Sequence, residues 1–308
     1  MIRRTRLSRR DLFRGTGAVV VAGGAGALLA ACGGGGGDDA TSATTTVGAG
    51  DATLNLLSAF DVNGAGLRVG APARLTYTLA DFEGVPLREI PAEATFTIGV
   101  DDGEGGIRPI GEPITVRAHA EGIPIPYYPV RFTPETEGVH AAGVTISGQP
   151  LAASFLVPAT SAVPGIGDPL PATTTATTAD PMGVDPVCTR PEPCGFHEVS
   201  LDDALGAAGP TVLVVSTPAF CQTGLCGPTL DLLVDLDLDP ARVVHVEVYA
   251  DATEVGVFDA TSVPVIGELG LSYEPSLFVA DADGRVVERL DNLWDRAELT
   301  AALALVGL

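Results

Sequence analysis

The C-terminal part of the chain is organised around residues 211–228, which read TVLVVSTPAFCQTGLCGP. The run Thr211–Ser216 is almost wholly apolar, which is typical of a strand that is buried on both faces of a sheet. A short loop then leads to Cys221, and leucines recur at helical spacing from Leu230 to Leu236. The sequence therefore predicts a buried strand, a loop that ends at a cysteine, and a helix.

Further elements are predicted on both sides of this strand. Ser200 is a good N-cap residue, so we expect a short helix over residues 200–208. Downstream, the pattern of apolar residues and turn residues predicts three strands and a final helix, over residues 243–249, 273–279, 285–290 and 295–306.

This order of elements resembles the thioredoxin-like superfamily over residues 187–308. The points of resemblance are Cys221 after a buried strand, the aromatic Phe220 before it, and Pro275 before a Ser-Leu-Phe-Val strand and an Asp-Gly turn. The resemblance implies thiol–disulfide exchange, with Cys221 as the attacking thiol and Cys226 as the resolving thiol. It also implies a cis Pro275 that shapes the groove for an incoming client chain.

The spacing of the two cysteines departs from the Cys-x-x-Cys of that family, because four residues separate Cys221 from Cys226. A disulfide requires Cα atoms about 4.4–6.8 Å apart. Five steps along a regular helix give about 7.5 Å in rise alone. The pair can close only if the first turn is unwound, and Gly224 and Gly227 make such a turn plausible.

A cysteine at the start of a helix faces free backbone N–H groups, which favour the thiolate over the thiol. We therefore expect Cys221 to be the nucleophile. The buried acid that accepts a proton in many thioredoxins would fall at Val215 and is missing. Glu274, just before Pro275, could partly replace it, although its charge would oppose a thiolate.

Three other functions remain open for this domain. It could be a non-catalytic surface binding or assembly module with inert cysteines. A peroxiredoxin-like peroxidase is weaker, because the Thr217-Pro218-Ala219-Phe220-Cys221 sequence has one residue too many for the peroxidatic motif. A copper-delivery protein is the third alternative, since relatives of that kind use two cysteines and a distant histidine.

Cys188 and Cys194 form the remaining cysteine pair of the domain. An even number of cysteines outside the cytoplasm is typical of a disulfide framework, so we expect a structural disulfide between them. A second redox pair and a metal site that also uses His197 and His245 are the alternatives. Because methionine is nearly absent and the spacing is unusual, we expect no metal and no cofactor.

Residues 53–157 show the alternation and turn spacing of an all-β sandwich, with strands predicted at residues 74–79, 94–100, 114–117, 128–132 and 143–146. The pattern resembles immunoglobulin-like extracellular modules and fits about seven strands. His119 and His140 are expected in ordinary strand or surface positions. We therefore expect this domain to act as a spacer or to bind a partner rather than to catalyse a reaction. Residues 158–186 are rich in Pro, Thr and Ala, which predicts a semi-rigid linker.

The N-terminus carries three signals in sequence: the twin arginine Arg9-Arg10, a short glycine-diluted apolar run, and Leu29-Ala30-Ala31-Cys32, which resembles a lipobox. These features predict a twin-arginine lipoprotein signal over residues 1–31, removed after lipidation of Cys32. Residues 32–52 are rich in Gly and Thr and read as a flexible tether.

The formal net charge is −22, and six of the 17 basic residues lie within the predicted signal. A surface this acidic repels nucleic acid, which is therefore excluded as a partner. We therefore expect a lipid-anchored protein on the extracytoplasmic face of a bacterial membrane. There it would act on client protein thiols or disulfides, and it could take electrons from a donor embedded in the membrane.

Overall fold

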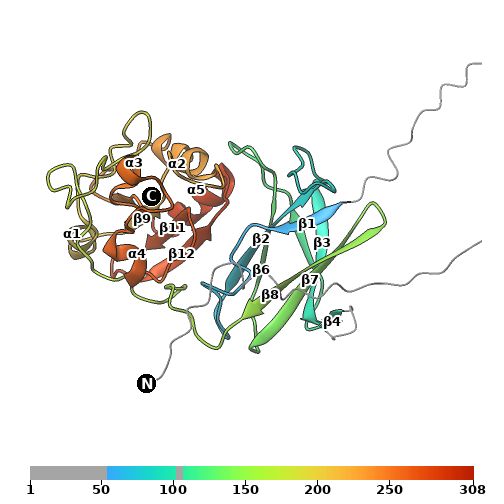
Figure 1. The fold of residues 1–308 in the computed structure, drawn as a ribbon. Helices are drawn as coiled ribbons and strands as arrows, with labels where there is room; N and C mark the ends of the chain where they lie inside the picture. Colours follow the sequence, from blue (N-terminus) through green and yellow to red (C-terminus); the bar gives the residue numbers. More distant parts are fainter. Residues whose placement is uncertain (1–53, 102–106) are drawn as a thin grey trace, which may run out of the picture. The chain divides into compact units, whose positions relative to one another are not determined.

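Alternating apolar residues build two antiparallel sheets in the N-terminal part of the protein (Figure 1). The computed structural model describes residues 54–101 and 107–308. One sheet has the order β1 (Asn55–Ser58), β2 (Ala73–Ala80), β6 (Tyr128–Phe132). The other has the order β4 (Ile107–Pro109), β3 (Glu93–Asp101), β7 (Gly138–Ile146), β8 (Gln149–Val157), and β5 (Ile114–Arg117) also pairs with β3.

The two sheets share one hydrophobic core, so they face each other as a sandwich. Tyr77 of β2 stacks on Phe96 of β3 with ring centroids 5.4 Å apart, and Phe96 meets Tyr128 of β6 edge-on at 5.6 Å. Val144 and Phe155 extend the same core along β7 and β8. We call this all-β part, residues 55–157, the sandwich lobe. The predicted strands lie within β2, β3, β5, β6 and β7, whereas β1, β4 and β8 were not predicted.

The predicted linker, residues 158–186, contains no helix or strand. It nevertheless packs on the C-terminal part of the protein, because Val163, Leu170 and Val184 are buried in a hydrophobic cluster there. The apolar residues between the prolines and threonines explain this packing. A solvated spacer would have no such packing.

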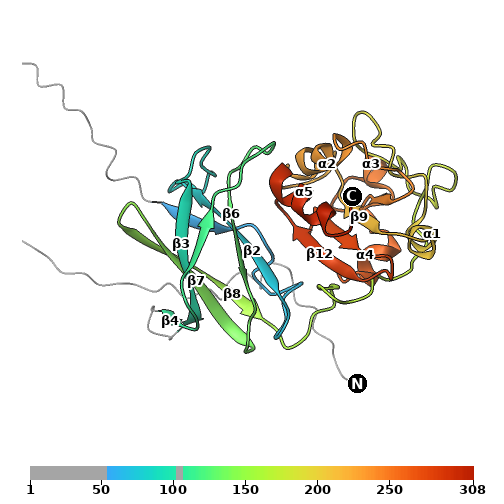
Figure 2. The same cartoon turned by 180° about the vertical axis from the view of Figure 1, so that it is seen from behind.

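The C-terminal lobe, residues 187–308, contains a four-stranded mixed sheet (Figure 2). Its order is β10 (Val243–Val246), β9 (Thr211–Val215), β11 (Ser276–Ala280), β12 (Val286–Asp291). Strands β9 and β10 are parallel, and the other two pairs are antiparallel. Every residue of β9 is buried, as its apolar sequence predicted.

Helices pack on both faces of this sheet. Leu213 and Val215 of β9 pack with α1 (Leu201–Gly206) and α4 (Pro264–Glu268) in one cluster. Val212 and Val214 point to the opposite face and pack with α2 (Cys226–Val234) and α5 (Arg296–Ala304). The short helix α3 (Ala252–Val255) follows β10. The result is an α/β lobe of three layers.

Buried polar contacts join the two lobes, which belong to one compact unit, Ala49–Leu308. The guanidinium of Arg74 forms an ion pair with Glu298 and also donates to the carbonyl of Leu293. The hydroxyl of Tyr127 donates to the same carboxylate. His119, expected in an ordinary position, places its Nδ1 2.9 Å from the carboxylate of Asp295, the N-cap of α5.

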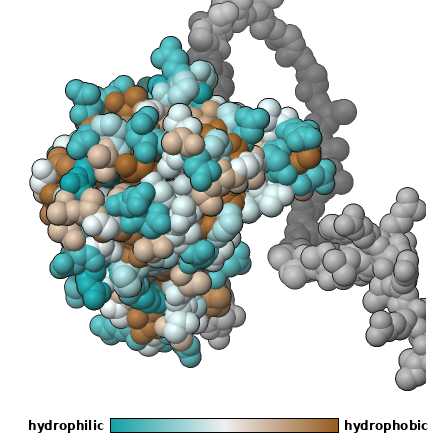
Figure 3. Space-filling model, turned by 90° about the vertical axis from the view of Figure 1, so that its left-hand side faces the viewer, coloured by the Kyte–Doolittle hydropathy of each residue, from teal (hydrophilic) through white to brown (hydrophobic). Residues whose placement is uncertain are grey.

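The described surface mixes hydrophilic and hydrophobic residues. Figure 3 shows a face of the C-terminal lobe on which hydrophobic residues lie scattered between hydrophilic ones. Within residues 54–101 and 107–308, we find no helix that is long and apolar enough to cross a membrane. The predicted signal, Cys32 and the predicted tether up to residue 52 lie outside the described residues.

Candidate functional site

The carboxyl end of β9 positions the first group of candidate residues. The backbone N–H of Ser216 donates to the carbonyl of Val246 at 3.0 Å, which continues the pairing of β9 with β10. The hydroxyl of Thr217 accepts the backbone N–H of Val248 at 2.9 Å. These bonds hold the start of the loop that leads to Cys221.

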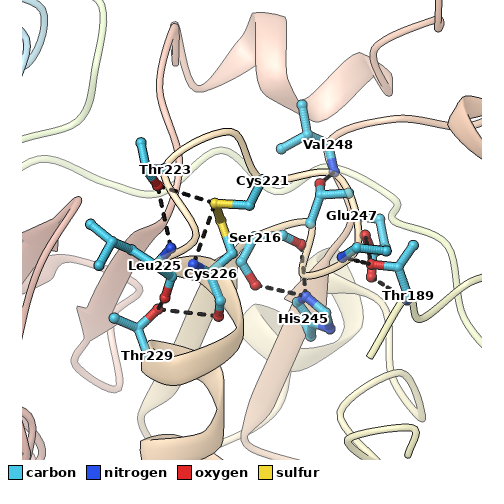
Figure 4. Close-up of a disulfide and its surroundings, with 12 residues drawn as sticks. Thr189, Ser216, Cys221, Thr223, Leu225, Cys226, Thr229, His245, Glu247 and Val248 are labelled. Carbon is cyan, nitrogen blue, oxygen red and sulfur yellow. Dashed lines mark hydrogen bonds between the residues drawn. A yellow bond between two sulfur atoms is a disulfide. The ribbon is translucent and has the colours of Figure 1, made fainter. Parts of the chain in front are cut away.

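Cys221 and Cys226 form a disulfide with Cα atoms 6.0 Å apart (Figure 4). The sequence predicted that the pair could close only with an unwound first turn. Helix α2 indeed begins at Cys226, and residues 221–225 form a turn outside it. Gly224 adopts φ +68°, a left-handed conformation that glycine tolerates without strain. The expected helix start at Cys221 was therefore wrong by five residues.

The two sulfur atoms have unequal surroundings. Cys226 is fully buried at 0% exposure, whereas Cys221 is half-buried and borders a groove. The backbone N–H of Cys226, the first residue of α2, donates to the sulfur of Cys221 at 3.3 Å. The Thr223 hydroxyl lies 3.2 Å from the same sulfur. Although Cys221 is not in the helix, it thus receives a donor from the helix N-terminus.

The groove beside Cys221 has a volume of about 350 Å³. Its walls come from residues 221–223, from Val248 and Tyr249 after β10, and from residues 271–274 before β11. The Glu274–Pro275 peptide bond is cis, and the carbonyl of Pro275 accepts the N–H of Asn292 at 2.7 Å. Pro275 therefore stands next in sequence to the wall of the groove that Cys221 borders.

Glu274 lies beside the disulfide. One of its carboxylate oxygens is within 4.8 Å of both sulfur atoms. Burial raises the pKa of Glu274 to about 7, and hydrogen bonds from Thr217 offset only part of that shift. Oε2 of Glu274 is buried without a hydrogen-bond partner among the described residues. Val215, the last residue of β9, is fully buried and apolar.

A second group of candidate residues lies on the other side of Ser216. It contains Cys188, Cys194, His197 and His245, whose ligand atoms all lie within 4.8 Å of one another. The sulfur atoms of the two cysteines are 3.8 Å apart and not bonded, which differs from the disulfide that the sequence predicted. Nδ1 of His245 lies 3.3 Å from the sulfur of Cys194 and 4.0 Å from the sulfur of Cys188.

The surroundings of this second group shift the pKa values of its two thiols in opposite directions. The contact with Cys194 lowers the pKa of Cys188, although burial opposes that shift. The same contact, together with burial, raises the pKa of Cys194. Burial lowers the pKa of His197, which favours the neutral imidazole. The sequence left a metal site of these two cysteines with His197 and His245 as an alternative, and the tertiary fold brings His245 of β10 onto the cysteine loop.

Thr189 connects the two groups. Its hydroxyl donates to the carboxylate of Glu247 at 3.0 Å and accepts the backbone N–H of Ala219 at 3.1 Å. Ala219 belongs to the loop that leads to Cys221. Figure 4 shows Thr189, Glu247 and His245 to the right of the disulfide. Sequence reasoning named none of Ser216, Thr189 and Thr223 as functional, because isolated hydroxyl residues carry no distinctive pattern.

Comparison with known proteins gives no name to this arrangement: no family model matches the chain, and no curated protein matches it.

We predict that the effect of Glu274→Gln on stability depends on pH. The pKa of Glu274 is raised from 4.5 to about 7 in the folded protein, so the folded state holds the extra proton between these values. Its contribution to stability is thus present below pH 4.5 and is lost as the pH rises through 7. The Glu274→Gln variant has no carboxyl group to titrate at this position. Its free energy of unfolding, relative to that of the unaltered protein, should therefore rise by about 1–2 kcal/mol between about pH 4.5 and pH 8, allowing for partial exposure.

Denaturant unfolding of the oxidised protein at the two pH values measures this change. The exposed Glu254 provides the matched control, and Glu254→Gln should show no such difference. A Glu274→Gln effect of equal size at both pH values would mean that the pKa of Glu274 is the same in the folded and unfolded states and would refute the assignment.

Proposed function

We propose that this protein is a thiol–disulfide oxidoreductase that uses the Cys221–Cys226 pair. The observation that carries the proposal is the asymmetry of the disulfide. One sulfur borders a groove that could receive a client chain, and the other is buried at the start of α2. Such an arrangement lets an incoming thiolate reach only Cys221.

The architecture of the C-terminal lobe supports a thioredoxin-like assignment. A cysteine pair follows the buried strand β9, with its second cysteine at the start of α2, and a cis proline precedes β11, as the resemblance implies. The antiparallel pair β11–β12 and helix α5 close the lobe in the expected order. For the sandwich lobe, the two facing antiparallel sheets support an immunoglobulin-like spacer or binding module.

In the oxidising direction, a client thiolate attacks the sulfur of Cys221. The bond between Cys221 and Cys226 breaks as the new bond forms, and its electron pair leaves on Cys226, which takes a proton. A second client thiolate then attacks the client sulfur and releases Cys221 as a thiolate. The client has lost two electrons, and the cysteine pair has gained them. The reducing direction reverses these steps.

Glu274 is placed to move the proton in this exchange. Its carboxylate lies within 4.8 Å of both sulfur atoms, and its pKa of about 7 lets it give or take a proton near neutral pH. The raised pKa also reduces the repulsion that an ionised Glu274 would exert on a thiolate. The hydrogen bond from the N–H of Cys226 stabilises negative charge on Cys221.

We predict an asymmetry between the two cysteines in trapping experiments. Cys226→Ser should accumulate mixed disulfides on Cys221, because no resolving thiol remains to release the client. Cys221→Ser should accumulate none on Cys226, since that sulfur is fully buried. Non-reducing electrophoresis and mass spectrometry of the adducts measure both.

The control for this experiment is the double variant Cys221→Ser, Cys226→Ser, which keeps Cys188 and Cys194 and shows any adduct formed there. Adducts on Cys226 alone would reverse the two roles. A lack of adducts in both single variants would contradict exchange and favour an inert binding or assembly module.

We also propose that the protein is anchored by a lipid on Cys32 at the extracytoplasmic face of a bacterial membrane. The order of twin arginine, apolar run and lipobox supports this position. Cys32→Ala should abolish partition into the detergent phase, whereas Cys221→Ser should leave it unchanged. Normal partition of the Cys32 variant would refute the anchor.

A further inference from the structure

Four nitrogen and sulfur atoms converge in the interior of the C-terminal lobe. Cys188, Cys194 and His197 come from the loop before α1, and His245 comes from β10. Cys194, His197 and His245 are 7%, 5% and 1% exposed. The group therefore joins an irregular segment to a buried strand of the sheet.

The distances between these atoms resemble the edges of a tetrahedron around one ion. Zinc binds cysteine sulfur at about 2.3 Å and histidine nitrogen at about 2.0–2.1 Å, which gives edges of about 3.8 Å between sulfurs, 3.3 Å between nitrogens and 3.6 Å between sulfur and nitrogen. The observed sulfur–sulfur distance is 3.8 Å, and the two histidine nitrogens are 2.9 Å apart. Nδ1 of His245 is 3.3 Å and 4.0 Å from the two sulfurs.

A backbone contact orients His245 for ligation. Its Nε2 lies 2.9 Å from the carbonyl oxygen of Ser216, which can only accept a hydrogen bond. The proton therefore sits on Nε2, and the lone pair of Nδ1 points toward the two sulfurs and His197. A second partner of this kind is typical of histidines that bind metals. Nδ1 of His197 has no partner among the described residues, so His245 is the better oriented of the two.

We propose that Cys188, Cys194, His197 and His245 bind one zinc ion as a structural site. Sulfur and imidazole ligands exclude calcium and magnesium, which prefer oxygen. Four protein ligands complete a tetrahedron and leave no position for a substrate, which is typical of structural rather than catalytic zinc. Binding releases the protons of the two thiols, and the two thiolates balance the charge of the ion within the buried site.

The site would order the segment that supports the active-site loop. Thr189, next to Cys188, accepts the N–H of Ala219 in the loop that leads to Cys221. An ion at the four ligands thus fixes one anchor of that loop. This inference is independent of thiol exchange, because the zinc site uses none of Cys221, Cys226 and Glu274.

The test is the metal content of the full-length chain, purified without chelator and loaded with zinc under reducing conditions. We expect one zinc per chain. Cobalt in its place should give the absorption of a tetrahedral site with thiolate ligands. The double variant Cys188→Ser, Cys194→Ser should lose both signals, while the matched control Cys221→Ser, Cys226→Ser keeps them. His245→Asn should weaken zinc binding more than His197→Asn.

A second measurement on the unaltered chain covers the case in which the variants do not fold. Zinc should protect Cys188 and Cys194 from alkylation, and a chelator should expose both thiols to it. Three results would overturn the proposal: less than one zinc per chain after loading, the same zinc content in the Cys188→Ser, Cys194→Ser variant, or a Cys188–Cys194 disulfide in the folded protein as isolated.

Discussion

The burial of strand β9 is the constraint on which the rest of the C-terminal lobe depends. All five residues of this strand are buried, and they pair with β10 on one side and β11 on the other. Alternate side chains enter two hydrophobic clusters, one on each face of the sheet. Because such a strand cannot shift by one residue without reversing both faces, its carboxyl end is fixed in position. Ser216 and Thr217 stand at that end, and each cysteine group of the lobe lies beside one of them.

The two groups use the same support, and the chemistry proposed for each is different. Thr217 begins a loop that places Cys221 at a groove, with Cys226 buried behind it. Ser216 fixes the orientation of His245, which faces Cys188 and Cys194. The difference in exposure fits the two proposed roles. Exchange requires a sulfur that a client can reach, whereas a structural ion requires a closed set of ligands. The loop contact between Thr189 and Ala219 makes the two groups neighbours without making them share a residue.

Much of the fold follows from local pattern. Strands β5 and β6 coincide with the predicted runs at 114–117 and 128–132, because alternation marks a sheet with one buried face. The start of α2 at Cys226 was not predicted, since helical spacing of leucines does not reveal where the first turn unwinds. The role of Glu274 was anticipated only in part, because its raised pKa depends on burial by distant segments. The contact of His245 with Cys188 and Cys194 depends on tertiary structure alone, and no local pattern encodes it.

The reduction potential of the Cys221–Cys226 pair tests the central claim most directly. It can be measured by equilibrating the full-length chain with glutathione buffers and quantifying alkylated Cys221 and Cys226 by mass spectrometry, so that Cys188 and Cys194 do not contribute. Structural disulfides resist reduction, with potentials below about −300 mV, whereas pairs that exchange with clients lie higher. An exchange-active pair with an accessible Cys221 should have a potential above about −250 mV. A value below about −300 mV would contradict the account and mark the pair as an inert structural bond.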